Sequence, residues 1–159
     1  MCCAKILVLG VIKMQLEQAD QMYREEMLSL ERVSILVAED DESIREILGL
    51  FLRSCGANVE FAENGLQSVQ KVLEKKFDIV LMDLSLPIMS GEKAVDLLRL
   101  AKVSIPIIGV TAYDDEARKK ECLSKGFSDF LTKPFELDDL VSKILFFTQK
   151  NTNVNLSIH

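Results

Sequence analysis

Five side chains able to do chemistry each stand at or just after the end of a short apolar run. Glu39 and Asp40 follow the first of these runs, Asp83 follows another, and Thr111 and Lys133 follow the last two. Carboxylates gathered at one point repel each other unless a cation neutralises them, and oxygen ligands of this kind suit Mg²⁺. A carboxylate can also attack a phosphorus centre and form an acyl phosphate. The set therefore predicts transfer of a phosphoryl group to an aspartate beside a magnesium ion.

The hydroxyl and ammonium groups complete this chemistry. A phosphoryl group in transfer carries charge on three equatorial oxygens, which need hydrogen-bond donors or cations. Thr111 and Lys133 are the candidate donors. Thr111 alone would suit a helix cap, but Asp114 is an equally good cap and leaves the threonine available. Lys133 precedes Pro134, which keeps the lysine backbone extended and aims the chain in a defined direction.

The simplest readings of the acidic residues are structural. Asp83 alone would fit an ordinary turn after an apolar run. Asp41 and Glu42 are expected only to cap a helix and to face solvent. The case for chemistry depends on all five side chains meeting at one place.

Apolar runs alternate with stretches of helical periodicity. Five strands are expected, at Ser34–Ala38, Asn58–Phe61, Asp78–Met82, Ile105–Val110 and Ser128–Leu131. Five helices are expected, at Glu42–Ser54, Asn64–Glu74, Gly91–Leu100, Asp114–Ser124 and Leu137–Phe147. Apolar strands that are each followed by a helix indicate an α/β, doubly wound, five-stranded parallel sheet with helices on both faces. Ligands of such sheets bind beyond the carboxyl ends of the strands, where the five side chains would converge.

Composition limits the classes of function. The chain has 159 residues, 48% of them hydrophobic, which is typical of one soluble domain with its own core. The net charge of -6 and the lack of a Lys/Arg stripe argue against nucleic acid as a partner. The opening apolar run is too short to span a bilayer and lacks the marks of a signal peptide, so we expect a cytoplasmic protein without membrane insertion. The one histidine is His159, so the body of the chain has no candidate phosphodonor.

Three segments are expected along the chain. Residues 1–32 form an N-terminal helical extension or linker, because Ile12–Leu30 has apolar residues at helical spacing. Residues 33–150 form the main domain, and residues 151–159 a polar, flexible tail.

From Val33 to Lys150 the sequence resembles the receiver domain of two-component response regulators. The resemblance is carried by four motifs in the right order, ILVAEDD (35–41), DIVLMDLSLPIMSG (78–91), PIIGVTAYDD (106–115) and GFSDFLTKPF (126–135). It implies a flavodoxin-like sheet with strand order 2-1-3-4-5.

The resemblance also implies a role for each site residue. Asp83 would accept the phosphoryl group, while Thr111 and Lys133 would bind its oxygens. The Mg²⁺ ligands would be three carboxylates and one backbone carbonyl, from Glu39, Asp40, Asp83 and Ser85. Asp40 would be the direct ligand of the acidic pair.

Three features of the family concern the aromatic switch, the lifetime of the phosphoryl group and the lysine. Thr111 and Phe130 would form the switch, although the family often has tyrosine where this chain has Phe130. Ser85 and Tyr113 occupy positions that tune the lifetime of the phosphoryl group in the family. The Lys133–Pro134 bond is usually cis in the family.

The resemblance implies a signalling function. A partner histidine kinase or phosphotransfer protein would phosphorylate Asp83, and a downstream protein would recognise the last two helices. No separate substrate is expected, so the chain would not be an enzyme in the ordinary sense. The broad apolar arc of the last helix has two readings, core packing or a docking or homodimer surface.

Two alternatives stay open. One is a pseudo-receiver, an interaction module with the same fold and no phosphoryl chemistry. The other concerns context, because the sequence is compatible with a stand-alone regulator and with a piece of a hybrid kinase. An aspartate-nucleophile phosphatase is disfavoured, because the segment from Asp83 to Ser85 lacks the second acid of the usual DxD arrangement.

Overall fold

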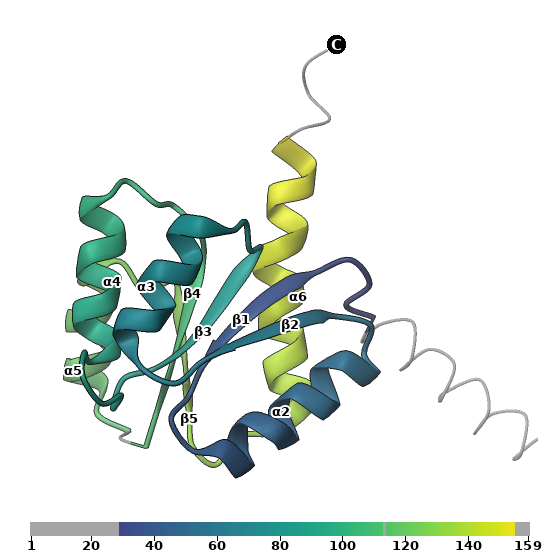
Figure 1. The fold of residues 1–159 in the computed structure, drawn as a ribbon, viewed down its shortest axis with the longest axis horizontal. Helices are drawn as coiled ribbons and strands as arrows, with labels where there is room; N and C mark the ends of the chain where they lie inside the picture. The colour runs from purple at the N-terminus through teal and green to yellow at the C-terminus, as the bar shows by residue number, and fades with distance from the viewer. Residues whose placement is uncertain (1–28, 113, 155–159) are drawn as a thin grey trace, which may run out of the picture.

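The computed structural model describes residues 29–112 and 114–154, in which five strands alternate with five helices. The strands are β1 (Ser34–Ala38), β2 (Asn58–Ala62), β3 (Ile79–Asp83), β4 (Ile107–Thr111) and β5 (Asp129–Thr132). The helices are α2 (Glu42–Ser54), α3 (Gly65–Glu74), α4 (Gly91–Leu100), α5 (Glu116–Lys125) and α6 (Leu137–Val154). All neighbouring strands pair in parallel, in the order β2-β1-β3-β4-β5, which confirms the predicted sheet (Figure 1).

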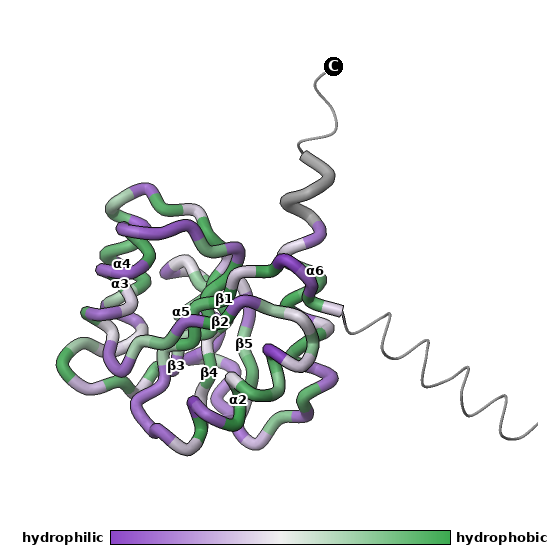
Figure 2. The backbone as a smooth tube through the Cα atoms, turned by 45° about the vertical axis from the view of Figure 1, so that its right-hand side comes forward, coloured by the Kyte–Doolittle hydropathy of each residue, from purple (hydrophilic) through white to green (hydrophobic). Residues whose placement is uncertain are grey.

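The helices cover the sheet on both faces. In Figure 1, α2 and α6 lie on one side of the sheet, and α3, α4 and α5 lie on the other. One buried cluster joins the sheet to α2 and α6 through side chains such as Leu52 and Ile144. A second cluster joins it to α3, α4 and α5 through side chains such as Leu98 and Cys122. The strands β1, β3 and β4 therefore have apolar surroundings on both sides, as their hydropathy in Figure 2 reflects.

Strand pairing continues past the apolar residues. We predicted that three strands end at Met82, Val110 and Leu131, whereas each ends one residue later. The register pairs Asp83 with Val110, and Thr111 with Thr132, so the backbone ladder extends into the polar residues. An apolar pattern marks where side chains are buried in the core, and the ladder does not depend on side-chain polarity.

Helix ends correct two further predictions. Asp115, and not Asp114, caps α5, because its carboxylate accepts from the amides of Ala117 and Arg118. Asp114 instead forms an ion pair with Lys119. The last helix does not end at Phe147 but continues to Val154, so residues 151–154 of the predicted tail are helical.

The predicted N-terminal helix overlaps the described residues only at Ser29 and Leu30. Residues 12–28 of the predicted helix Ile12–Leu30 lie outside the described residues, as do residues 155–159 of the tail. Ser29 and Leu30 are described and are not helical. Leu30 is fully buried and donates its amide to the carbonyl of Cys55 at 2.7 Å. The division at residue 32 stays a prediction. Among the described residues, none of the helices has both the length and the apolarity to cross a membrane.

The guanidinium of Arg99 joins the end of α4 to two loops. It donates to the carbonyl of Gly126 from two nitrogens, at 3.0 and 2.7 Å. It also donates to the carbonyls of Val103 and Ile105, at 2.7 and 2.9 Å. Three partly buried carbonyls thus depend on one side chain.

Replacing Arg99 by alanine should lower the free energy of unfolding by about 2–3 kcal/mol, because the three carbonyls lose their donor. Urea denaturation followed by circular dichroism measures this change. Arg53→Ala is the matched control, because the exposed Arg53 donates only one bond, to Val59, and should cost less than about 1 kcal/mol. Equal losses in the two variants would contradict the prediction.

Candidate functional site

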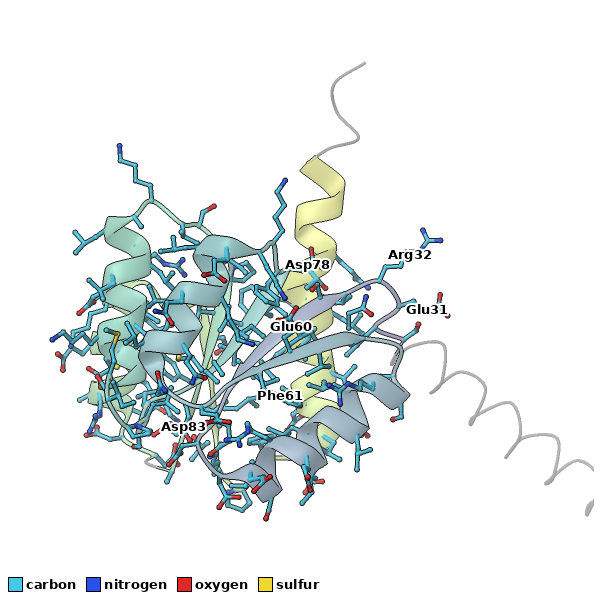
Figure 3. All side chains as sticks on the ribbon, viewed as in Figure 1. Glu31, Arg32, Glu60, Phe61, Asp78 and Asp83 are labelled. Atoms are coloured by element: carbon cyan, nitrogen blue, oxygen red, sulfur yellow. The ribbon has the colours of Figure 1, made fainter. Side chains whose placement is uncertain are left out.

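The register of the sheet brings distant residues to one edge. β1 pairs Ala38 with Met82, so Glu39, one residue on, stands beside Asp83. Thr111 ends β4 next to the same point, and Lys133 follows the end of β5. Figure 3 shows Asp83 at this end of the sheet and Asp78, just before the same strand, at the opposite end.

Lys133 joins two of the predicted acids. Its Nζ atom lies 2.7 Å from Oδ2 of Asp83 and 2.7 Å from Oε2 of Glu39. Both carboxylates are buried, with 8% of Asp83 and 4% of Glu39 exposed. The peptide bond between Lys133 and Pro134 is cis, as the family resemblance implied. We call Glu39, Asp40, Asp83 and Lys133 the acid–lysine cluster.

Backbone amides hold the remaining oxygens of these two carboxylates. The amide of Ser85 donates to Oδ1 of Asp83 at 2.7 Å. The amide of Asp41 donates to Oε1 of Glu39 at 3.2 Å. Asp41 is exposed, and its own carboxylate accepts from the amide of Ile44, so it caps α2 as predicted.

The donor set of the cluster fits a hard divalent cation. Glu39, Asp40 and Asp83 each offer a carboxylate oxygen, and these oxygens lie within 4.8 Å of one another. Asp40 is exposed, whereas the other two are buried, so the group opens to solvent on one side. Carboxylate oxygens with room for water are the coordination that Mg²⁺ prefers.

Burial and the lysine act in opposite directions on these charges. Burial raises the pKa of Glu39, and the hydrogen bond from Lys133 offsets only part of this effect. Burial alone would lower the pKa of Lys133, but its hydrogen bonds to Asp83 and Glu39 outweigh burial and raise the pKa. The lysine is therefore held in its charged form, while charging Glu39 has a cost.

In metal-free protein, Glu39→Gln should increase stability relative to wild type, and the gain should grow as the pH rises from below 4.5, the ordinary pKa of glutamate. The folded-state pKa of Glu39 is raised, so its contribution to stability is complete below 4.5 and is lost as pH rises through the folded-state pKa. Urea denaturation in a chelator at several pH values measures the difference. The exposed Glu74→Gln is the control, and a gain independent of pH would contradict the prediction.

Thr111 and Phe130 line the same hollow near the cluster. Thr111 is 4% exposed and its carbonyl accepts from the amide of Lys133 at 2.7 Å. Thr111 and Phe130 line one small hollow, together with Leu84 and Cys122 and with polar residues of α5 and its cap. Phe130 is 8% exposed and belongs to the buried cluster of α3, α4 and α5, so its ring points inward. The two predicted switch residues are thus neighbours.

Gly109 makes room for the inward ring. A Cβ atom at this position of β4 would lie 2.2 Å from Cε1 and 2.5 Å from Cδ1 of Phe130. Real Cβ atoms do not approach other atoms so closely, so a side chain here would displace the ring. The absence of a side chain at residue 109 therefore permits the buried orientation of Phe130.

Gly109→Ala should destabilise the protein by about 1–3 kcal/mol and move the ring of Phe130 outward, because overpacking of a filled site forces neighbours aside. Urea denaturation measures the first effect, and NMR contacts of the Phe130 ring measure the second. Adding Phe130→Leu should recover part of the loss, because the smaller side chain makes room for the methyl group. Additive losses would contradict the proposed clash.

Tyr113 lies outside the described residues, while Ser85 contributes the amide described above.

One further residue was missed by the sequence reasoning. Arg45 of α2 donates from Nη1 to the carbonyls of both Glu39 and Asp40. A basic residue one turn into an acidic helix start was the available signal, but an ordinary solvated arginine has the same appearance in the sequence.

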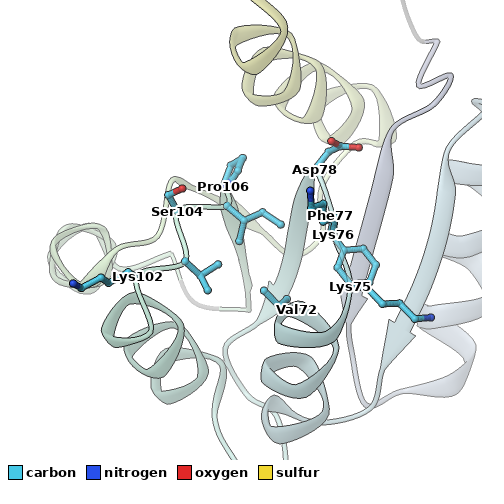
Figure 4. Close-up of a pocket in the computed structure, with 10 residues that line it drawn as sticks. Val72, Lys75, Lys76, Phe77, Asp78, Lys102, Ser104 and Pro106 are labelled. Atoms are coloured by element: carbon cyan, nitrogen blue, oxygen red, sulfur yellow. The ribbon is translucent and has the colours of Figure 1, made fainter. Parts of the chain in front are cut away.

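A larger hollow lies at the other end of the sheet (Figure 4). It is lined by three lysines, Lys75, Lys76 and Lys102, around an apolar floor that includes Phe77 and Pro106. These lysines follow the C-terminal ends of α3 and α4, where a cation is favourable to the helix dipole. Their positions are thus explained without a ligand, and the hollow is remote from the acid–lysine cluster.

The fold and the site together define a class of protein, an open parallel α/β domain with a cluster of carboxylates and a lysine at the carboxyl edge of its sheet. The family described as the response regulator receiver domain matches residues 35–145, and the chain belongs to this family. The resemblance noted in the sequence is therefore confirmed. Phosphorelay signalling, phosphoaspartate and Mg²⁺ are general features of the family.

The chain is also similar in sequence to individual proteins. The transcriptional regulatory protein ZraR of Klebsiella oxytoca is 41% identical over 113 residues, which are 71% of this chain and 26% of that protein. A cyclic di-GMP phosphodiesterase of Thermotoga maritima is 39% identical over 112 residues, 70% of this chain and 30% of that protein. The chain spans about a quarter to a half of the length of the curated relatives that it matches.

Solved structures show the same fold. A co-crystal structure of the phosphotransfer protein Ypd1 with the receiver domain of Ssk1, from Saccharomyces cerevisiae, contains a chain with a TM-score of 0.72 and 28% identity. The match covers 76% of this chain and 92% of that one. The receiver domain of a Francisella response regulator gives a TM-score of 0.73 at 26% identity, covering 76% of this chain and 99% of that one.

Proposed function

We propose that this chain is a phosphorylation-dependent receiver, in which Asp83 accepts a phosphoryl group from a phosphohistidine of a partner kinase or phosphotransfer protein. The observation that supports this most is the double contact of Lys133, whose Nζ atom lies 2.7 Å from both Asp83 and Glu39. It places a buried carboxylate, a fixed cation and an acidic pair at one point.

In the proposed step, an oxygen of Asp83 attacks the phosphorus atom of the donor. The new O–P bond gives an acyl phosphate, while the N–P bond breaks and its electron pair stays on the imidazole nitrogen. Lys133 neutralises charge on the phosphoryl oxygens, and the hydroxyl of Thr111 donates to another of them. The same residues would assist the later attack of water, so the domain needs no separate substrate.

The cation of this site would be Mg²⁺. The side chains of Glu39, Asp40 and Asp83 would hold it, with the backbone carbonyl of Ser85 as a further ligand. Bound there, Mg²⁺ would neutralise charge on the phosphoryl oxygens.

Phosphorylation would then change a protein surface. Movement of Thr111 toward the phosphoryl group would alter the space beside Phe130 and favour a second packing of α5, β5 and α6. Leu123 of α5 and Phe146 of α6 are 43% and 54% exposed and offer apolar contacts to a downstream protein or to a second copy of the chain. We also propose that this signalling takes place in the cytoplasm, without a direct nucleic-acid contact.

Incubation with phosphoramidate, a small donor with a P–N bond, and Mg²⁺ tests the proposal. Intact-mass spectrometry should detect one added phosphoryl group, which hydroxylamine removes and a chelator prevents. Failure to take up the group, together with undetectable Mg²⁺ binding by calorimetry, would instead favour the pseudo-receiver, an interaction module independent of phosphorylation.

A further inference from the structure

Arg45 is placed where a helix does not favour a cation. It lies in the first turn of α2, which begins at Glu42, and positive charge near a helix N-terminus opposes the helix dipole. Its side chain is nevertheless only 13% exposed. An arginine held in such a position needs compensating acceptors, and the structure supplies three.

Two of these acceptors belong to the acidic pair itself. Nη1 of Arg45 donates to the carbonyl of Glu39 at 2.8 Å and to the carbonyl of Asp40 at 2.8 Å. Nη2 lies 3.5 Å from Oε1 of Glu63, in the loop between β2 and α3. One guanidinium therefore fixes two consecutive peptide groups at the point where the chain leaves β1.

The two carboxylates depend on this backbone to different degrees. Glu39 has its own partners, because its oxygens accept from Lys133 and from the amide of Asp41. Among the described residues, no hydrogen bond or ion pair holds the carboxylate of Asp40. The position from which Asp40 offers its oxygen is thus fixed by its backbone alone, and Arg45 holds that backbone.

We infer that Arg45 is the positioning residue of the cation site, acting through the backbone of Glu39 and Asp40 without contacting the ion. This inference rests on the proposed function of the cluster. Groups that orient metal ligands typically contribute 10- to 100-fold to metal affinity, so about a tenfold loss is expected when Arg45 is removed.

The test compares Arg45→Ala with Arg53→Ala. Arg53 is a matched control, because it lies on the same helix and donates to a single carbonyl, that of Val59, outside the cluster. Calorimetric titration with Mg²⁺ should give about a tenfold weaker affinity for Arg45→Ala and an unchanged affinity for Arg53→Ala. In phosphoramidate reactions, Arg45→Ala should need more Mg²⁺ for half of the maximal rate, while the maximal rate stays within about twofold of wild type.

A purely structural role would change the melting temperature of Arg45→Ala and leave the Mg²⁺ affinity of the folded protein as in wild type, and that result would overturn the inference. Arg45→Lys keeps the charge but loses the planar fork, so it should bind Mg²⁺ a few-fold more weakly. If Arg45→Ala does not fold, Arg45→Lys becomes the deciding variant, because a wild-type Mg²⁺ affinity in Arg45→Lys would also overturn the inference.

The wild-type protein separates this inference from the proposed function. If it binds Mg²⁺ but takes up no phosphoryl group, the proposed function fails, and the Mg²⁺ affinities of the Arg45 variants still decide the role of Arg45. If it binds no Mg²⁺, both fail.

Discussion

Replacing Asp83 by asparagine is expected to abolish phosphoryl uptake from phosphoramidate. The amide cannot attack phosphorus as a carboxylate does. Among the described residues, Asp83 is the one carboxylate that ends a central strand and also contacts Lys133. Intact-mass spectrometry at saturating Mg²⁺ should therefore find only unmodified protein after a time in which wild type is fully converted.

Asp78→Asn is the matched control for this prediction. Asp78 precedes the same strand at its other end, where Oδ2 accepts from the amide of Ser34 at 2.7 Å (Figure 3). The change from aspartate to asparagine is chemically identical, but its distance from the cluster should leave uptake at the wild-type level. Hydroxylamine-sensitive phosphorylation of Asp83→Asn would show that another residue is the acceptor.

Removing the ammonium group of Lys133 should have the second largest effect. Lys133→Met keeps much of the length of the side chain but leaves the carboxylates of Asp83 and Glu39 without their shared cation. Loss of a donor aimed at developing charge typically lowers rates by 10²–10³-fold, and we expect a decrease of about that size in phosphorylation at saturating Mg²⁺. The initial rate of mass increase with phosphoramidate measures it.

Lys143→Met controls for the loss of an ion-paired lysine as such. Lys143 of α6 pairs with Asp129, outside the acid–lysine cluster. Its replacement should leave the initial rate within about twofold of wild type. A Lys133→Met protein that is folded, by circular dichroism, and reacts as fast as Lys143→Met would remove the lysine from the proposed step.

The parallel sheet could be predicted because its central strands are almost entirely apolar and each strand is followed by a helix. Ile79–Asp83 and Ile107–Thr111 are buried along their whole length, which requires a sheet covered on both faces. The carboxyl edge then follows from the connections, and with it the convergence of Asp83, Glu39 and Lys133. The resemblance to receiver domains assigned a role to each of them.

The features that could not be predicted produce no periodic pattern of apolar residues in the sequence, and most of them depend on individual hydrogen bonds. Asp115 caps α5 in place of the predicted Asp114, and two adjacent aspartates look alike in the sequence. Arg99 has an ordinary position near the end of its helix, and Arg45 lies in a first turn that does not favour a cation, but for both only the backbone carbonyl partners distinguish them from solvated arginines. The continuation of α6 to Val154 has no apolar signal, because residues 149–153 are polar.

The double contact of Lys133 has a consequence for repeated signalling. Its ammonium group is shared between side chains at the ends of two different strands, so phosphorylation of Asp83 would still leave Glu39 to retain the lysine. The amine would then stay in place whether Asp83 is phosphorylated or not. Each new cycle would start with the lysine already at the reaction centre, with no search for its working conformation.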